Sequence, residues 1–232
     1  MSETPDAFYA RRLREELDGG EPELAMLGSL VGRGGVAVDI GANEGVYAYA
    51  LSELGAVVHA FEANPEFAAF AADMLGNRAE VYQLALSNET GEASFFVPLA
   101  ADGSELHLAG NLKNSHSQFD RQTVIKVGVR TLDAFDLRGV QFIKVDVEGS
   151  ELEVLEGARE TIARDHPGLL LELLSGTYVD PLAVTREVCE KYRYSAFIVH
   201  NGKRLEALPT IAALGANTTW GSEIATRNVL FL

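Results

Sequence analysis

The sequence predicts an α/β domain with a mostly parallel central sheet and helices on both of its faces. First, residues 36–40 form a short apolar run that ends in a glycine-containing turn, and helical apolar spacing follows at once. Second, this strand-then-helix order recurs along the chain. Third, residues 168–174 are continuously apolar except for Glu172, which is typical of a strand buried on both faces. The 232 residues suffice for one such domain.

The N-terminal segment, residues 1–32, is expected to be helical and to pack on a single domain formed by residues 33–232. Residues 6–17 are amphipathic, which predicts a first helix. A second helix is expected from Glu21, because Pro22 suits a first helical turn and acidic residues suit the positive end of the helix dipole.

The remaining elements alternate, with one interruption. β-branched and aromatic residues predict strands at 36–40, 57–61, 80–84, 93–97, 123–129, 140–147, 168–174, 195–200 and 226–232. Helices are predicted at 45–54, 65–75, 150–163 and 181–192, with a short helical turn at 131–135. Ser150 and Glu153 have the spacing of a capping box at the start of one helix, and Asn201-Gly202 is typical of a hairpin turn.

The interruption is a loop insertion at about residues 98–122, rich in Gly, Asn and Ser. So long a loop inside a compact domain is typical of a lid or a binding loop. We expect it to face the substrate; the alternative is a surface loop without a role.

Composition and charge argue against several partners. The net charge is −15, and the one short basic cluster, Arg11, Arg12 and Arg14, is diluted by acids and predicts a solvated helix face. Nucleic acids and anionic membranes need a basic patch, so neither is expected as a partner. No membrane span or signal peptide is visible, and Cys189 is the single cysteine. A cytoplasmic protein is expected, and nothing indicates its oligomeric state.

The turn after the first strand predicts a nucleoside site. Gly41 permits a tight turn, and Gly45 lets the following helix begin close to a ligand. Glu62 ends the next strand, 23 residues after Asp39, where a carboxylate can accept both hydroxyls of a ribose. Asn43 stands where a dinucleotide fingerprint has its second glycine, which favours a nucleoside without phosphates, such as S-adenosylmethionine. An NAD(P)-dependent oxidoreductase and a non-catalytic S-adenosylmethionine-binding module are the alternatives.

Four motifs carry a resemblance to a known family. They are residues 38–45 (VDIGANEG), 61–65 (FEANP), 130–135 (RTLDAF) and 143–151 (IKVDVEGSE). With them, the chain resembles the class I S-adenosylmethionine-dependent methyltransferases and, within these, the FkbM family. The similarity runs from about Glu21 to the C-terminus.

The resemblance implies a Rossmann-like fold and an activity. It implies a seven-stranded sheet of order 3-2-1-4-5-7-6 with the last strand antiparallel, so that strands 93–97 and 123–129 become an accessory β-hairpin. It also implies methyl transfer to a hydroxyl oxygen of a sugar or natural-product-like small molecule, with S-adenosylhomocysteine as the product.

Ligands of such sheets bind at the carboxyl ends of the strands. The turn backbone is expected to face the methionine part of the cofactor, Glu62 the ribose, and residues 84–86 the adenine. Asp39 could instead cap loop amides, and Glu62 could be a surface acid that caps the next helix. The predicted cofactor-binding residues are Asp39, Gly41, Ala42, Asn43, Gly45, Glu62, Ala63, Leu84, Ala85, Leu86 and Asp146.

Asp146 is the expected catalytic base, because it ends the fourth strand beside the cofactor. Lys144 shares its strand face and would lower its pKa or orient it; the alternative is a buried ion pair without a catalytic part. His116, in the long insertion, is a candidate second base or substrate contact, unless it is a solvated loop histidine. Asp146 and Glu172 with a loop residue could hold Mg²⁺, although carboxylates alone do not show a metal.

Overall fold

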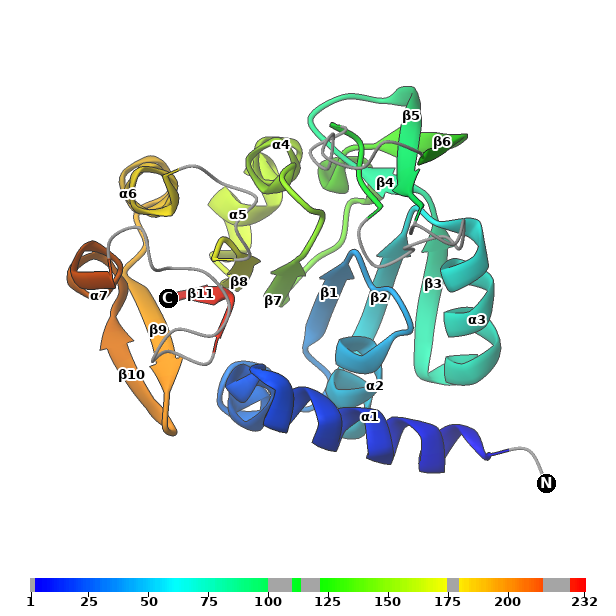
Figure 1. Cartoon of the computed structure of the whole chain (residues 1–232), viewed down its shortest axis with the longest axis horizontal. Coiled ribbons are helices and arrows are strands. Elements are labelled where there is room, and N and C mark those ends of the chain that lie inside the picture. Colours follow the sequence, from blue (N-terminus) through cyan, green and yellow to red (C-terminus); the bar gives the residue numbers. More distant parts are fainter. Residues whose placement is uncertain (1–2, 100–109, 114–121, 175–179, 215–225) are drawn as a thin grey trace.

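The described residues form a central sheet of eight strands (Figure 1). In this computed structural model the described residues are 3–99, 110–113, 122–174, 180–214 and 226–232. The strand order is β10-β9-β11-β8-β7-β1-β2-β3. The strands are β1 (Val36–Ile40), β2 (Val57–Glu62), β3 (Ala79–Gln83), β7 (Val140–Val145), β8 (Gly168–Glu172), β9 (Ala196–His200), β10 (Lys203–Glu206) and β11 (Asn228–Phe231).

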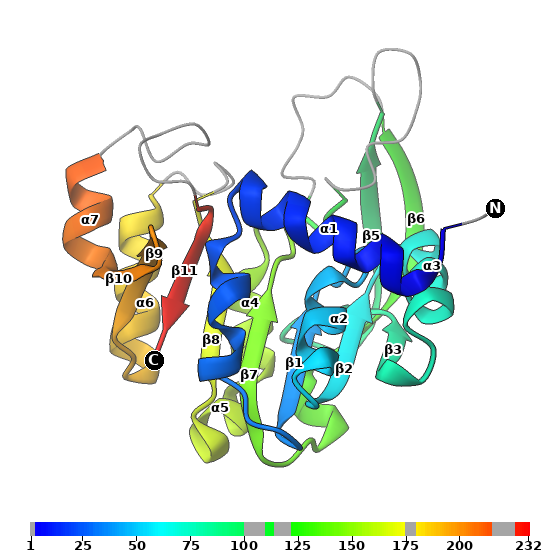
Figure 2. The same ribbon diagram turned by 90° about the horizontal axis from the view of Figure 1, so that it is seen from below.

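The helices lie in two layers, one on each face of the sheet (Figure 2). One layer holds α1 (Pro5–Gly19), η1 (Pro22–Ser29), α2 (Val46–Glu53) and α3 (Pro65–Leu75). The other holds α4 (Glu151–Gly157), α5 (Arg159–Asp165), α6 (Pro181–Tyr192) and α7 (Ala207–Leu214). Short 3₁₀ helices η2 (Gly76–Arg78) and η4 (Leu132–Phe135) connect elements. No helix of the described chain is long and apolar enough to cross a bilayer.

Alternation along the central strands explains the two layers. Val38 and Ile40 belong to the core beneath α4–α7, whereas Ala37 between them packs toward α1–α3. In β7, Phe142 also packs on the α1–α3 side. Residues two apart share a strand face, so Lys144 points to the same side as Phe142. The polar residues at the end of β7 therefore face the N-terminal helices.

The predicted α/β class is confirmed, with one difference in the sheet. The order β3-β2-β1-β7-β8-β11-β9 matches 3-2-1-4-5-7-6, and β11 is antiparallel to both neighbours. The seven-strand prediction omitted β10, which pairs antiparallel with β9. Asn201 and Gly202 have φ values of 50° and 70°, the left-handed pair that a tight hairpin turn requires, so the chain folds back and adds an edge strand.

The accessory hairpin is also present, and it is larger than expected. Strands β5 (Gly91–Pro98) and β6 (Gln122–Arg130) pair antiparallel over their whole length. A two-residue strand, β4 (Ala85–Leu86), pairs parallel with β6 and makes a three-stranded sheet. Of the insertion between β5 and β6, only residues 110–113 are described, and Asn111 bridges to Phe96 through two main-chain hydrogen bonds.

The helix predicted over residues 150–163 is two helices, α4 and α5, that break at Ala158. The Asp133 carboxylate accepts hydrogen bonds from the main-chain N–H groups of Glu160 and Thr161, which stabilises a new helix start there. The capping box of Ser150 and Glu153 was a wrong prediction, because Ser150 makes no side-chain cap.

α1 packs against α2 through aromatic rings, and η1 is a 3₁₀ helix where a second helix was predicted. Tyr9 is fully buried and stacks on Tyr49 with ring centroids 4.4 Å apart. The acids of η1 are buried, not exposed at a helix end as their positions suggested: the Glu23 carboxylate accepts a hydrogen bond from the Thr226 hydroxyl at 2.6 Å. The N-terminal segment is thus joined to both α2 and the entry to β11.

Candidate active site

The carboxyl ends of β1, β2 and β7 open into one cavity. The predicted cofactor and catalytic residues that line it are Asp39, Gly41, Ala42, Asn43, Glu62, Ala63, Leu84, Ala85, Leu86, Lys144 and Asp146. Glu172 lines it as well. Gly45 does not, and His116 lies outside the described residues. The structure therefore gathers nearly the whole predicted set in one place, and the binding roles of these residues stay predictions.

The turn between β1 and α2 explains its glycines. Gly41 has φ 75°, and a Cβ there would lie 1.7 Å from the main-chain oxygen of Asp146, so only glycine lets β1 and β7 end this close together. Gly45 has φ 83° and starts α2. Asn43 is also left-handed, with φ 52°. The turn thus depends on residues that tolerate this conformation, since ordinary side chains disfavour it.

Glu62 is buried at the cavity wall and touches the turn. Its Oε2 accepts a hydrogen bond from the main-chain N–H of Asn43 at 2.8 Å, and its Oε1 accepts one from the N–H of Asn64 at 2.7 Å. Burial raises the pKa of Glu62 to about 7, although both N–H groups act to lower it. The N-cap of α3 is Asn64 rather than Glu62, so the helix-capping alternative for Glu62 does not describe its place.

Asp39 is buried and also holds the start of α2. Its Oδ2 accepts a hydrogen bond from the main-chain N–H of Ala48 at 3.0 Å. Burial raises the pKa of Asp39 to about 6, while Lys144 acts to lower it. The amide-capping role that we weighed for Asp39 is therefore present, and the side chain lines the cavity as well.

Lys144 and Asp146 form a buried ion pair, as their shared strand face predicted. The Lys144 Nζ donates to Asp146 Oδ2 at 2.8 Å. Burial would lower the pKa of Lys144, but the carboxylates around it, led by Asp146, outweigh burial and raise it. Burial likewise acts to raise the pKa of Asp146, but Lys144 and a hydrogen bond from Glu172 hold it below its usual value. Asp146 is therefore ionised at neutral pH.

Glu172 completes this group from the end of β8. Burial and the neighbouring Asp146 raise the pKa of Glu172 well above its usual value. Two adjacent carboxyl groups with opposite shifts share one proton, which here resides on Glu172. Arg227 Nε lies 3.2 Å from Glu172 Oε1, and Arg227 Nη2 lies 3.2 Å from Glu21 Oε1.

Glu21 and Tyr47 close these contacts into a ring. The Tyr47 hydroxyl donates to Glu21 Oε2 at 2.7 Å, and Lys144 Nζ lies 4.7 Å from the centre of the Tyr47 ring. A side chain from η1 thus reaches the catalytic lysine through α2 and reaches Glu172 through Arg227. Buried polar networks that are satisfied in this way rigidify the groups they contain.

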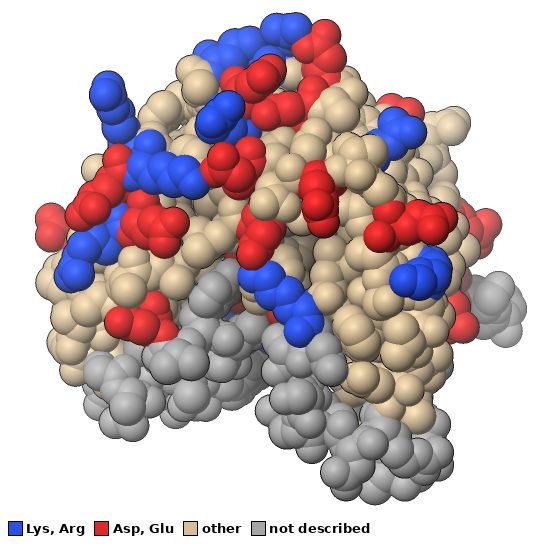
Figure 3. Space-filling model, turned by 90° about the horizontal axis from the view of Figure 1, so that it is seen from above, with Lys and Arg blue, Asp and Glu red and all other residues tan. Residues whose placement is uncertain are grey.

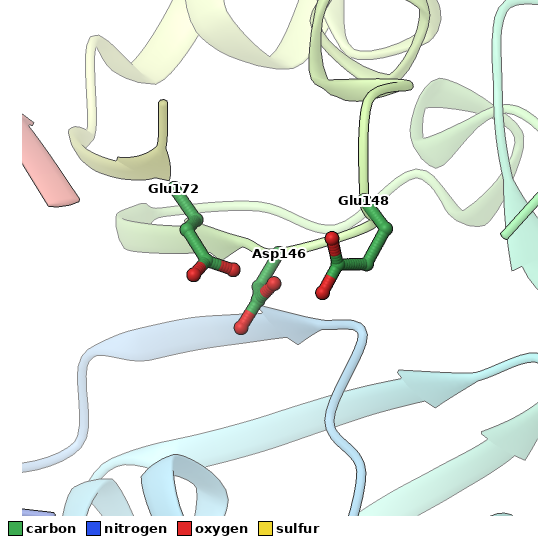
Figure 4. Close-up of side chains that lie close together, drawn as sticks. All are labelled: Asp146, Glu148 and Glu172. Carbon is green, nitrogen blue, oxygen red and sulfur yellow. The ribbon is translucent and has the colours of Figure 1, made fainter. Parts of the chain in front are cut away.

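Figure 4 shows Asp146, Glu148 and Glu172 turned toward one another at the ends of β7 and β8. One carboxylate oxygen from each lies within 4.8 Å of the others, so Glu148 is the third residue that the Mg²⁺ expectation left unnamed. Lys144 and Arg227 already oppose the charge of two of these carboxylates. A divalent cation is not needed to balance the cluster, and we propose none.

Several cavity residues gave no signal in the sequence. The N-terminal segment contributes Arg12, Glu16 and Glu21, and the start of β11 is preceded by Arg227. Arg12 was predicted to lie on a solvated helix face, which was wrong: its Nε donates to Glu44 Oε2 at 2.9 Å beside the cavity. Periodicity places residues on a helix face, but which face meets a distant turn depends on tertiary packing.

Buried carboxyl groups also predict how stability depends on pH. Burial raises the pKa of Glu23 and of Glu62 to about 7, and that of Asp39 to about 6. The folded state therefore binds more protons than the unfolded state in this window, so the free energy of unfolding should fall as pH rises from about 5 to about 7.5. His59, whose pKa burial lowers, opposes this trend as a single group.

Urea unfolding at a series of pH values measures this dependence, and Glu62→Gln should flatten it because one of the raised carboxyl groups is removed. A free energy of unfolding that increases with pH across the window would contradict the expectation.

The surface gives no contrary sign about partners. On the face drawn in Figure 3, Lys and Arg side chains are interspersed with Asp and Glu, without a contiguous basic patch among the coloured residues. This agrees with the acidic composition, and the absence of a nucleic-acid partner stays a prediction.

Comparisons with known proteins bear on the family. The Methyltransferase FkbM domain matches residues 39–195. The 2-O-methyltransferase NoeI of Sinorhizobium fredii (strain NBRC 101917 / NGR234) is 30% identical over 145 residues, which cover 56% of this chain and 59% of that protein. The crystal structure of methyltransferase FkbM from Methylobacillus flagellatus KT aligns with a TM-score of 0.54 at 17% identity, over 85% of this chain and 43% of that one.

The fold and the family match define a class of enzyme: the S-adenosylmethionine-dependent methyltransferases. Within it, the chain belongs to the FkbM family, as the resemblance predicted. The oxidoreductase alternative is thereby set aside. The chain spans less than two thirds of the length of each of the two relatives named above, so their whole activities are not carried over to it.

Proposed function

We propose that this protein transfers a methyl group from S-adenosylmethionine to a hydroxyl oxygen of a small molecule of the sugar or natural-product kind. The observation that carries the proposal is the meeting of the turn at residues 41–45, Glu62 and Asp146 in one cavity. The name of the relative NoeI, a 2-O-methyltransferase, supports oxygen as the acceptor atom.

The residues present fit such a cofactor. Asn43 Oδ1 is buried without a hydrogen-bond partner among the described residues, and a buried oxygen of this kind suits a donor group on a ligand. Glu62 presents a carboxylate to the cavity beside the turn, where it can accept hydrogen bonds from ribose hydroxyls. Apolar side chains of Leu84 and Leu86 line the wall beyond it and can cover an adenine ring.

Bound S-adenosylmethionine supplies a methyl group on a sulfonium, which is already activated for displacement. The chain then has to orient an acceptor hydroxyl and accept its proton. The Asp146 carboxylate, kept ionised by Lys144, is the acceptor of that proton. Glu172 and Arg227 hold Asp146 from the other side, so the carboxylate keeps a fixed direction in the cavity.

Isothermal titration calorimetry with S-adenosylhomocysteine tests the cofactor part of this proposal. We expect a dissociation constant in the micromolar range for the full chain and no measurable binding of NADH in a fluorescence titration. No heat with S-adenosylhomocysteine would refute the proposal.

A screen of hydroxylated small molecules with isotope-labelled methyl donor tests the acceptor part. Label should enter sugars or natural products at oxygen, and turnover should survive EDTA because Lys144 and Arg227 do the charge balancing. Methylation only of nitrogen acceptors would contradict the proposed acceptor atom, and complete absence of transfer beside intact cofactor binding would favour the non-catalytic binding module.

A further inference from the structure

Glu44 is the residue through which α1 reaches the cofactor turn. It lies between Asn43 and Gly45, which have left-handed φ values of 52° and 83°. The Tyr9 hydroxyl donates a hydrogen bond to the main-chain oxygen of Glu44 at 2.8 Å. Arg12 Nε donates to the Glu44 carboxylate at 2.9 Å. The turn is therefore tied to α1 by both its main chain and its side chain.

The packing around Tyr9 shows that this contact is built into the fold. Tyr9 is 0% exposed and stacks on Tyr49 of α2. A Cβ on Gly45 would lie 3.1 Å from the Tyr9 hydroxyl oxygen and 2.9 Å from Leu75 Cδ1. Gly45 does not line the cavity, so its lack of a side chain serves the approach of α1 to the turn rather than the approach of a ligand.

Arg12 is fixed in place by three carboxylates. Besides Glu44, its guanidinium pairs with Glu15 at 2.8 Å and with Glu16 at 2.7 Å, and the side chain lines the cavity. Figure 2 shows α1 lying alongside α2. Both Tyr9 and Arg12 precede residue 39, where the match to the family domain begins, so the family match assigns them no role.

We propose that α1 is a working part of the cofactor site and that Tyr9 and Arg12 are positioning residues that hold the turn in its ligand-binding conformation. The inference rests on the proposed function of the cavity as an S-adenosylmethionine site. Asn43 is not a glycine, and its left-handed conformation costs free energy that surrounding contacts must offset. Without the bonds to Glu44, other turn conformations become populated, and the apparent affinity falls by the competent fraction.

Calorimetric titration of S-adenosylhomocysteine into full-length variants tests the proposal. Tyr9→Phe removes the hydroxyl alone and keeps the stacked ring, and Arg12→Gln removes the ion pair. Each should raise the dissociation constant by about threefold to tenfold, the net worth of one such hydrogen bond. Arg11→Gln is the matched control, because Arg11 lies on the same helix and pairs with Glu3 and Glu15 without touching the turn; its affinity should equal that of the wild type.

A double variant shows whether Arg12 acts through Glu44. If it does, Arg12→Gln combined with Glu44→Gln should bind S-adenosylhomocysteine no more weakly than the weaker single variant. A purely structural role for α1 predicts a lowered melting temperature with unchanged affinity at temperatures where the variants are folded, and that result would overturn the inference while leaving the proposed function standing. Failure of the wild-type chain to bind S-adenosylhomocysteine would overturn both.

Discussion

Asp146→Asn should abolish methyl transfer while leaving S-adenosylhomocysteine binding nearly intact. The asparagine amide cannot accept the proton of the acceptor hydroxyl, and loss of a positioned base costs about a hundredfold or more in turnover. The change is nearly isosteric, so Lys144 keeps an oxygen acceptor at the position that now lies 2.8 Å from its Nζ. Turnover is measured with labelled methyl donor and an acceptor from the screen, and the dissociation constant by calorimetry.

The comparison of these two measurements separates catalysis from structure. An affinity for S-adenosylhomocysteine within about threefold of the wild type shows that the cavity is intact, since a change of that size is well under 1 kcal/mol. Unchanged turnover in Asp146→Asn would remove Asp146 from the role of base. Joint loss of binding and turnover would instead assign Asp146 to cofactor binding.

Glu62→Gln should weaken S-adenosylhomocysteine binding by about tenfold or more. Hydrogen bonds from hydroxyls to a buried carboxylate are stronger than those to a neutral amide, and the amide NH₂ would in addition oppose the N–H of Asn43 or of Asn64. Because burial raises the pKa of Glu62 to about 7, the wild-type affinity should also increase as pH rises from about 6 to about 8. The variant should lose this pH dependence.

Glu66→Gln provides the control for Glu62. Glu66 stands in the first turn of α3, is exposed, and does not line the cavity, so its neutralisation changes the local charge without touching the ligand. Its affinity and pH profile should match those of the wild type. Equal affinities for Glu62→Gln and the wild type would remove Glu62 from the cofactor site.

Local patterns predicted the central part of the site. The strand ending at Asp39, the glycine turn and the strand ending at Glu62 are each readable from a few consecutive residues, and parallel strands bring their ends to one edge of the sheet. The i, i+2 spacing of Lys144 and Asp146 predicted their shared face, and the ion pair at 2.8 Å confirms it.

Other features depended on contacts between segments far apart in the chain. Ser150 has the spacing of an N-cap, yet Asp133, from the preceding connection, determines where the next helix starts. α7 was missed, although Ala207 and Ile211 have helical spacing and are buried. Glu21 and Glu23 read as acids at a helix end, and the structure buries both against Asn228 and Thr226.

The sequence by itself determined the class of fold, the position of the cofactor turn and the pairing of Asp146 with Lys144, because these follow from spacing within one strand or between adjacent strands. Only the tertiary structure decided that α1 and η1 supply Tyr9, Arg12 and Glu21 to the same cavity. A helix pattern states which residues face inward, but it carries no information about what they will meet. That choice is made by packing across the sheet, where residues 200 positions apart bury their polar groups together.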